Sequence, residues 1–321
     1  MPPRIDFFEQ QRRNRKETAL LIGGFIVLLG VLGLGLDLSY LQAGFPWLTL
    51  AALSFGGLDS WMSFYLGDKM VLSSVGARKP DPTLLKEQQL QNVVQEMALA
   101  SGLPVPQVYI VTEASPNAFA TGRDAAHASI AVTSGLLETM DREELQGVVA
   151  HEMGHIRNRD ILTMMIVAAL LGAIVLLADF GRRMVFYGGL GRGGGRKKDS
   201  LQGVMIVIVL VLMILAPIIA RLMALAVSRS REYMADAASA EFTRNPVALA
   251  NALEKISTHY DQVVDKASQG TAHLFISDPL NKAVNKKEGR FAAWMGTHPP
   301  IQNRIRILRQ MAGVYAAPSQ T

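Results

Sequence analysis

The sequence predicts a mainly α-helical integral membrane protein with four apolar helices and an α+β domain that contains a small sheet. Half of the 321 residues are hydrophobic, and many of them gather in four separate runs. Each run is close to the length that a helix needs to cross the ~30 Å hydrocarbon layer of a bilayer. Between the second and third runs, the pattern changes to the shorter alternating and amphipathic segments of a water-exposed domain.

The four apolar runs lie at 19–36, 45–66, 161–178 and 203–220. The first run contains no charged residue, and the second has Trp47 near one end and Trp61 and Tyr65 near the other. Aromatic residues at both ends are typical of a membrane helix. Four such runs argue against buried core helices of a soluble protein. A cleaved signal peptide is also disfavoured, because the first run is long and a second follows at once.

Lysine and arginine residues predict the orientation of the first two helices. Basic residues precede the first run, none occurs in 37–44, and Lys69, Arg78 and Lys79 follow the second run. The positive-inside rule then places the N-terminus and residues 67 to about 160 in the cytoplasm. The loop between the third and fourth runs is also basic, which opposes a complete second hairpin. Either the first pair dominates the orientation, or the second pair does not fully cross.

The segment after the second run predicts a helix followed by strands. Residues 83–101 carry apolar residues at helical spacing, and Gly102 is placed to end that helix. Residues 106–113 and 127–137 read as strands, and the short stretch 117–122 lies between them.

The next helix carries the first candidate chemistry, in the stretch "GVVAHEMGHIRNRD". Asp141 and Glu144 form a capping box that starts a helix reaching about Asn158. On that helix His151 and His155 project from one face, so they can bind one metal ion together.

Glu152, directly after the first histidine, can act as the general base on a metal-activated water. The chain has no cysteine, so a zinc ion would need histidine and carboxylate ligands. The alternative is a surface helix with two solvated histidines. The apolar flanks of the helix argue against it, because a buried unpartnered pair would be costly.

A third ligand is predicted in "SREYMADAAS", residues 230–239. Glu232 and Asp236 are four apart on one helix face, which follows the fourth apolar run. Glu232 would complete a two-histidine, one-carboxylate site, and Asp236 would orient a histidine. The alternative is that Glu232 pairs with Arg229 or Arg231.

Five stretches in order resemble the HtpX-type membrane zinc metalloproteases, which are relatives of the CAAX prenyl endopeptidases. They are "NAFATG", "AHEMGHIRNRD", "REYMADAAS", "AHLFISDPL" and "THPPIQNRIRIL". The resemblance implies a gluzincin-like α+β catalytic domain with a cytoplasm-facing site. His151, His155 and Glu232 align with the zinc ligands of that family, and Glu152 aligns with its catalytic glutamate.

The resemblance also covers residues outside the ligand set. Asp236 aligns with the aspartate of the family's E-x-x-x-D helix, and we predict a catalytic role for it. Arg159 departs from the pattern, because the family usually has glycine at that position.

Residues 117–122 resemble the family's edge strand, which pairs with extended substrate. We therefore predict that Asn117 and Phe119 contact substrate. The alternative for Asn117 is that it only shapes a turn after Pro116.

In "THPPIQNRIRIL", the two prolines suit a helix start. We predict that His298 is catalytic and that Arg304 contacts substrate, both by stabilising an oxyanion. The alternative is a helix cap and a surface charge.

The apolar runs and the resemblance together predict five segments along the chain. They are a basic cytoplasmic N-terminus (1–18), a transmembrane hairpin (19–66), a zincin catalytic subdomain (67–160), a second apolar helix pair with a basic glycine-rich loop at 181–200 (161–228), and a third-ligand helix with a C-terminal helical subdomain (229–321).

The expected function is that of a zinc-dependent endopeptidase with one zinc per chain, in the inner membrane of a prokaryote. It would cleave misfolded or damaged membrane proteins as part of quality control and the stress response. The partners would be polypeptides and the lipid bilayer. Nucleic acid is not expected, because the basic residues lie beside apolar runs. The alternatives are a processing protease for a dedicated lipidated or membrane peptide and a non-catalytic zinc-binding scaffold. The oligomeric state is left open.

Overall fold

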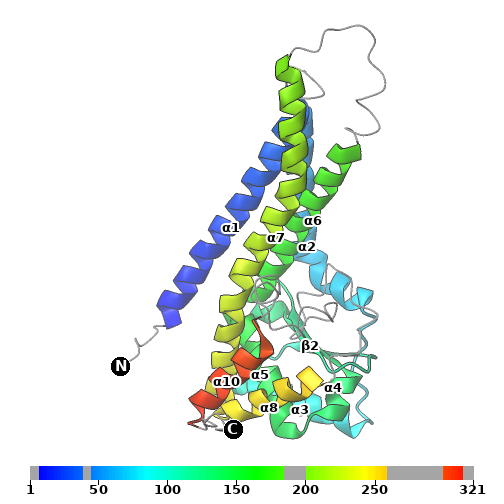
Figure 1. Ribbon diagram of the computed structural model, residues 1–321. Helices are drawn as coiled ribbons and strands as arrows, with labels where there is room; N and C mark the ends of the chain where they lie inside the picture. The colour runs from blue at the N-terminus through cyan, green and yellow to red at the C-terminus, as the bar shows by residue number, and fades with distance from the viewer. Residues whose placement is uncertain (1–6, 39–44, 184–199, 259–298, 314–321) are drawn as a thin grey trace. The chain divides into compact units, whose positions relative to one another are not determined.

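The computed structural model describes residues 7–38, 45–183, 200–258 and 299–313. The chain divides into two compact units (Figure 1). The first unit comprises Met1–Phe64 and Met165–Val227, and the second comprises Tyr65–Met164 and Ser228–Thr321.

All four apolar runs are helical. They lie in α1 (Phe7–Leu36), α2 (Trp47–Ser74), α6 (Asp160–Arg183) and α7 (Ser200–Thr243). In the first unit, α1, α6 and α7 share an apolar core that includes Phe25, Leu29, Ile174 and Ala216. The carboxylate of Asp37 accepts hydrogen bonds from the backbone N–H groups of Leu48 and Thr49, so it caps the start of α2.

Two segments of the described residues are long and apolar enough to cross a membrane, judged by length and composition. They are Ala19–Leu36 and Asp160–Arg183, and Leu210–Ala220 forms a shorter apolar stretch. In α2, Asp59 and several serines and glycines interrupt the apolar residues. That there are four membrane-spanning helices therefore stays a prediction.

The second unit contains a three-stranded sheet of β1 (Gln107–Val111), β2 (Ala118–Thr121) and β3 (Ser129–Thr133). The strand order is β1-β3-β2, in which β1 runs parallel and β2 antiparallel to β3. The short 3₁₀ helix η2 (Ala125–His127) lies between β2 and β3. The edge position predicted for residues 117–122 is therefore confirmed within this sheet.

The predicted strand at 127–137 is wrong in its second half. The strand ends at Thr133, and helix α4 (Ser134–Thr139) follows. The Thr133 hydroxyl accepts a hydrogen bond from the backbone N–H of Leu136, so it acts as the helix N-cap. The apolar leucines after it are equally compatible with a strand or a helix.

The other predicted helices of the second unit are confirmed. Helix α3 (Leu85–Ser101) ends at Gly102, whose φ of 69° is left-handed. Helix α5 (Arg142–Asn158) starts with the predicted capping box between Asp141 and Glu144. Helix α10 (Ile301–Met311) follows the two prolines, and Asn245 caps a further helix, α8 (Pro246–Thr258). Helix α5 packs against α3, α8 and β2, and α10 packs against α8.

Two glycines of α5 allow neighbouring helices to approach its backbone. A Cβ atom on Gly147 would lie 2.7 Å from the backbone nitrogen of Leu249 in α8. A Cβ atom on Gly154 would lie 2.9 Å from the Cβ of Ala238 and 3.1 Å from the Cα of Ala235, both in α7. Glycine at 154 therefore lets α7 lie directly against α5.

Helix α5 ends at Arg159, which has a left-handed φ of 60°. Its backbone N–H donates to the carbonyl groups of His155 and Ile156. A residue with a Cβ atom is disfavoured in this conformation by roughly 1 kcal/mol, whereas glycine adopts it freely. The glycine expected at 159 from the resemblance thus has a structural reason.

Replacing Gly154 with alanine should destabilise the second unit. The new methyl group would overlap α7, and such overpacking costs about 1–3 kcal/mol. We expect a lower thermal unfolding midpoint for Gly154→Ala. Gly172→Ala in α6 is the matched control, because a Cβ atom there meets nothing within 4 Å. Equal midpoints for the two variants would contradict the close packing of α5 and α7.

Replacing Arg159 with glycine should stabilise the protein by roughly 0.5–1 kcal/mol, because the left-handed backbone then carries no steric penalty. The thermal midpoint should rise. Arg157→Gly, inside the last turn of α5, should instead lower it, because glycine weakens a helix interior. A midpoint that falls in both variants would show that the Arg159 side chain stabilises the protein by more than its left-handed backbone destabilises it.

Candidate metal centre

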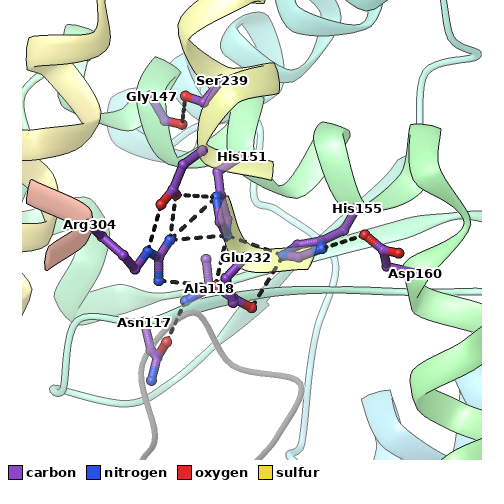
Figure 2. A network of polar contacts seen from close by, with 10 residues as sticks. Asn117, Ala118, Gly147, His151, His155, Asp160, Glu232, Ser239 and Arg304 are labelled. Atoms are coloured by element: carbon purple, nitrogen blue, oxygen red, sulfur yellow. Dashed lines mark hydrogen bonds and ion pairs between the residues drawn. The ribbon is translucent and has the colours of Figure 1, made fainter. Parts of the chain in front are cut away.

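The predicted ligands meet in the second unit (Figure 2). Helix α5 supplies His151 and His155, and α7 supplies Glu232. All three side chains are buried, with 0%, 6% and 1% of their surface exposed. Their potential ligand atoms lie within 4.8 Å of one another.

The spacing of the three donors suits a small cation. The Nε2 atoms of the two histidines are 3.2 Å apart, and each lies 3.6 Å from an oxygen of Glu232. A tetrahedral zinc with ligand bonds of about 2.0–2.1 Å would separate its donors by roughly 3.3 Å. The residues therefore fit a zinc-like ion without large movement.

A carboxylate lies behind each histidine and leaves its Nε2 atom directed at Glu232. Asp236 Oδ1 is 3.0 Å from His151 Nδ1, and Asp160 Oδ2 is 3.2 Å from His155 Nδ1. Such contacts fix the ring orientation and the tautomer of metal-binding histidines. Asp236 therefore lies where it can orient His151, as predicted from the sequence.

The sequence pattern did not predict that Asp160 belongs to the centre. Its signal was an acidic residue just past the end of α5, five positions after His155. The left-handed Arg159 turns the chain there, and Asp160 begins α6.

Arg304 of α10 reaches the centre from far along the chain. Its guanidinium donates two hydrogen bonds to Asp236, at 2.9 and 2.7 Å, and its Nη1 lies 3.0 Å from Glu232 Oε2. Only 1% of the residue is exposed. Arg304 thus approaches the site as expected, but its guanidinium is engaged by two carboxylates. Substrate contact by Arg304 stays a prediction.

Glu152 is buried beside the ligands and touches the sheet. Burial raises the pKa of its carboxyl to about 7, although a hydrogen bond from the backbone N–H of Ala120 opposes this shift. Ala120 belongs to β2, so the predicted general base is joined to the edge strand. A carboxylate with a pKa near neutrality is well suited to accept and return a proton.

The two histidines titrate differently in the absence of a cation. Burial lowers the pKa of His151 to about 4, with Asp236 only partly opposing it. Burial also lowers the pKa of His155, but Asp160 and Glu232 outweigh it and raise that pKa to about 9. A cation bound at Nε2 would lower both values, because it competes with the proton.

The charges buried at the centre also favour a divalent cation. The carboxylates of Glu152, Asp160, Glu232 and Asp236 face the guanidinium groups of Arg231 and Arg304. When these six groups are ionised and both histidines are neutral, as metal binding requires, the set carries an excess of two negative charges. Without a cation, protonated His155 offsets part of this excess. A buried excess charge is costly, and a dication would offset it.

The remaining predicted residues lie as follows. Asn117 is buried, and its Oδ1 accepts a hydrogen bond from the backbone N–H of Ala118 at 3.0 Å (Figure 2). Phe119 packs in an apolar cluster with Leu72 and Val75, which favours a packing role. His298 lies outside the described residues. Substrate contact by Asn117 and Phe119 stays a prediction.

Comparison with known proteins assigns the chain to a family. Residues 84–312 match Peptidase family M48. A Protease HtpX homolog of Caldanaerobacter subterraneus subsp. tengcongensis is 45% identical over 304 residues, which cover 95% of this chain and 97% of the relative. One of Streptococcus thermophilus is 41% identical over 309 residues and covers 95% and 99%. One of Aquifex aeolicus is 42% identical over 267 residues and covers 82% and 84%.

One solved structure has a fold similar to that of this chain. The crystal structure of S. mikatae Ste24p matches with a TM-score of 0.53 at 18% identity, over 94% of this chain and 66% of that protein. At this identity the likeness concerns the fold alone. The family match and the relatives, which extend over most of the chain, decide the assignment. The chain therefore belongs to peptidase family M48, and it is a metalloprotease.

Proposed function

We propose that this metalloprotease is a zinc-dependent endopeptidase of a prokaryotic inner membrane. It would face the cytoplasm and hydrolyse misfolded or damaged membrane proteins. The observation that carries the proposal is the convergence of His151, His155 and Glu232 beside the buried carboxylate of Glu152. A purely structural zinc site would not need such a base.

Different residues of the chain would have different roles in peptide hydrolysis. Bound zinc would act as a Lewis acid that polarises the scissile carbonyl and acidifies a water. Glu152 would take a proton from the attacking water onto its carboxylate and pass it to the leaving amine. Asp236 and Asp160 would hold the two imidazoles, so that the donor set does not have to rearrange during the reaction.

The edge strand supports a polypeptide substrate. Strand β2 lies at the edge of the sheet, and its Ala120 bonds to Glu152. A substrate in extended conformation could add to this edge through backbone hydrogen bonds. Its scissile bond would then lie near the base. This mode of binding recognises the backbone of the substrate rather than its side chains, which suits unfolded proteins of varied sequence.

The membrane location rests on composition. Ala19–Leu36 and Asp160–Arg183 are long and apolar enough to span. The basic residues around the first helix pair favour a cytoplasmic catalytic unit. The relatives are named Protease HtpX homolog, in agreement with the resemblance found in the sequence.

Metal analysis of the full chain, purified in detergent without chelator, should find about one zinc per chain. Glu232→Gln should lose most of it, because the neutral amide is a poorer zinc ligand. His127→Ala is the control, because this exposed histidine pairs with Asp124 away from the centre. A wild-type protein without zinc would refute the proposed cofactor.

Glu152→Gln should lower cleavage of unfolded casein by at least about 10²-fold, because the amide cannot accept the proton. Zinc content should remain unchanged, since Glu152 is not a ligand. The measurement is kcat/KM together with metal analysis of the same sample. Wild-type activity in this variant would remove Glu152 from the mechanism.

The rate should fall in acid as Glu152 becomes protonated. Burial raises the pKa of Glu152 to about 7 without a cation, and a bound dication should lower it. We therefore expect the acid limb of kcat/KM to have an apparent pKa below 7, with activity present above it and lost below it. Zinc content measured at each pH separates this effect from metal release. A kcat/KM that stays constant as the pH is lowered well below 7, at unchanged zinc content, would argue against this assignment.

A further inference from the structure

Arg231 and Asp160 form a buried ion pair next to the metal centre. Arg231 is 2% exposed and Asp160 is 1% exposed. Arg231 Nε lies 3.5 Å from Asp160 Oδ1, while the other carboxylate oxygen, Oδ2, contacts His155 Nδ1 at 3.2 Å. Removing one partner of such a pair leaves the other charge buried and uncompensated, at a large cost.

The same order of groups occurs behind the other histidine. There, Arg304 binds Asp236, and Asp236 contacts His151 Nδ1. Each imidazole is thus followed by an aspartate and then by a buried arginine. Figure 2 shows His155 lying between Glu232 on one side and Asp160 on the other.

The position of Arg231 in the chain links two helices of the centre. Arg231 immediately precedes Glu232 on α7, and Asp160 immediately follows the left-handed Arg159 that ends α5. The ion pair therefore connects α7, which carries Glu232, to the turn at Arg159 that follows His155. One turn of α7 thus supplies the predicted ligand Glu232 and also Arg231. The guanidinium of Arg231 holds the carboxylate of Asp160 behind His155.

We propose that Arg231 is a positioning residue for the metal centre. Through Asp160 it fixes the ring of His155 with Nε2 directed at Glu232. This inference rests on the ligand set of the proposed function. It goes beyond that set by giving Arg231 a role in metal affinity that it exerts through Asp160.

The test is a double-mutant cycle read out as zinc affinity. The dissociation constant of the full chain in detergent is measured by competition with a chromophoric chelator at neutral pH. Arg231→Gln and Asp160→Asn should each weaken zinc binding by about 10–100-fold, as removal of groups behind metal ligands does. The double variant should bind about as well as Asp160→Asn alone, because coupled residues are not additive.

Two further variants separate positioning from folding. Arg231→Lys keeps the positive charge and should recover most of the affinity. Arg157→Gln is the matched control, because Arg157 lies two residues after His155 but pairs with Glu241 outside the centre. It should bind zinc like the wild type. In the cobalt-substituted protein, Asp160→Asn and Arg231→Gln should alter the visible absorption bands in the same direction.

The outcomes are distinct. Wild-type affinity in Arg231→Gln, or effects of the two substitutions that simply multiply, would overturn the positioning role. If Arg231→Gln does not fold, Asp160→Asn and Arg231→Lys decide, because unchanged affinity and spectra in Asp160→Asn would also overturn it. A wild-type chain that binds no zinc would overturn the proposed function first, and these variants would not be needed to show it.

Discussion

The direct packing of α7 against α5 is the contact on which the metal centre depends. Glycine at 154 leaves room for the backbone of α7 at Ala235, and the Ser239 hydroxyl donates a 2.7 Å hydrogen bond to the carbonyl of Gly147. Helices in contact are usually 8–10 Å apart, and only small residues permit the shorter end of that range. This closeness lets Glu232 reach two histidines that project from the neighbouring helix.

Buried charge gives the centre its second constraint. Acidic side chains from α5, α6 and α7 are compensated in part by guanidinium groups from α7 and α10. A low-dielectric interior penalises any unpaired member of such a network. With both histidines neutral, the negative charge that remains at the centre would be offset by a bound dication. The pairing of the base with β2 extends this network to the sheet.

Several residues that support the metal ligands come from segments that supply no ligand themselves. Helix α10 contributes mainly a buried stripe of Ile305 and Leu308, yet it also brings Arg304 between Asp236 and Glu232. The left-handed end of α5 likewise looks like a local defect, but it directs Asp160 back toward His155. Elements that supply no metal ligand thereby fix the orientation of the ligands.

The sequence by itself determined the local features: the capping box at Asp141, the helices over the apolar runs and the paired histidines one turn apart. These depend on residues within a few positions of one another, so periodicity and capping patterns report them. The helix start at Thr133 was missed because a short apolar run suits a strand equally well. Only the tertiary structure decided which charges meet, because Asp160, Arg231 and Arg304 find their partners through the packing of α5, α7 and α10, and no local pattern encodes packing over such distances along the chain.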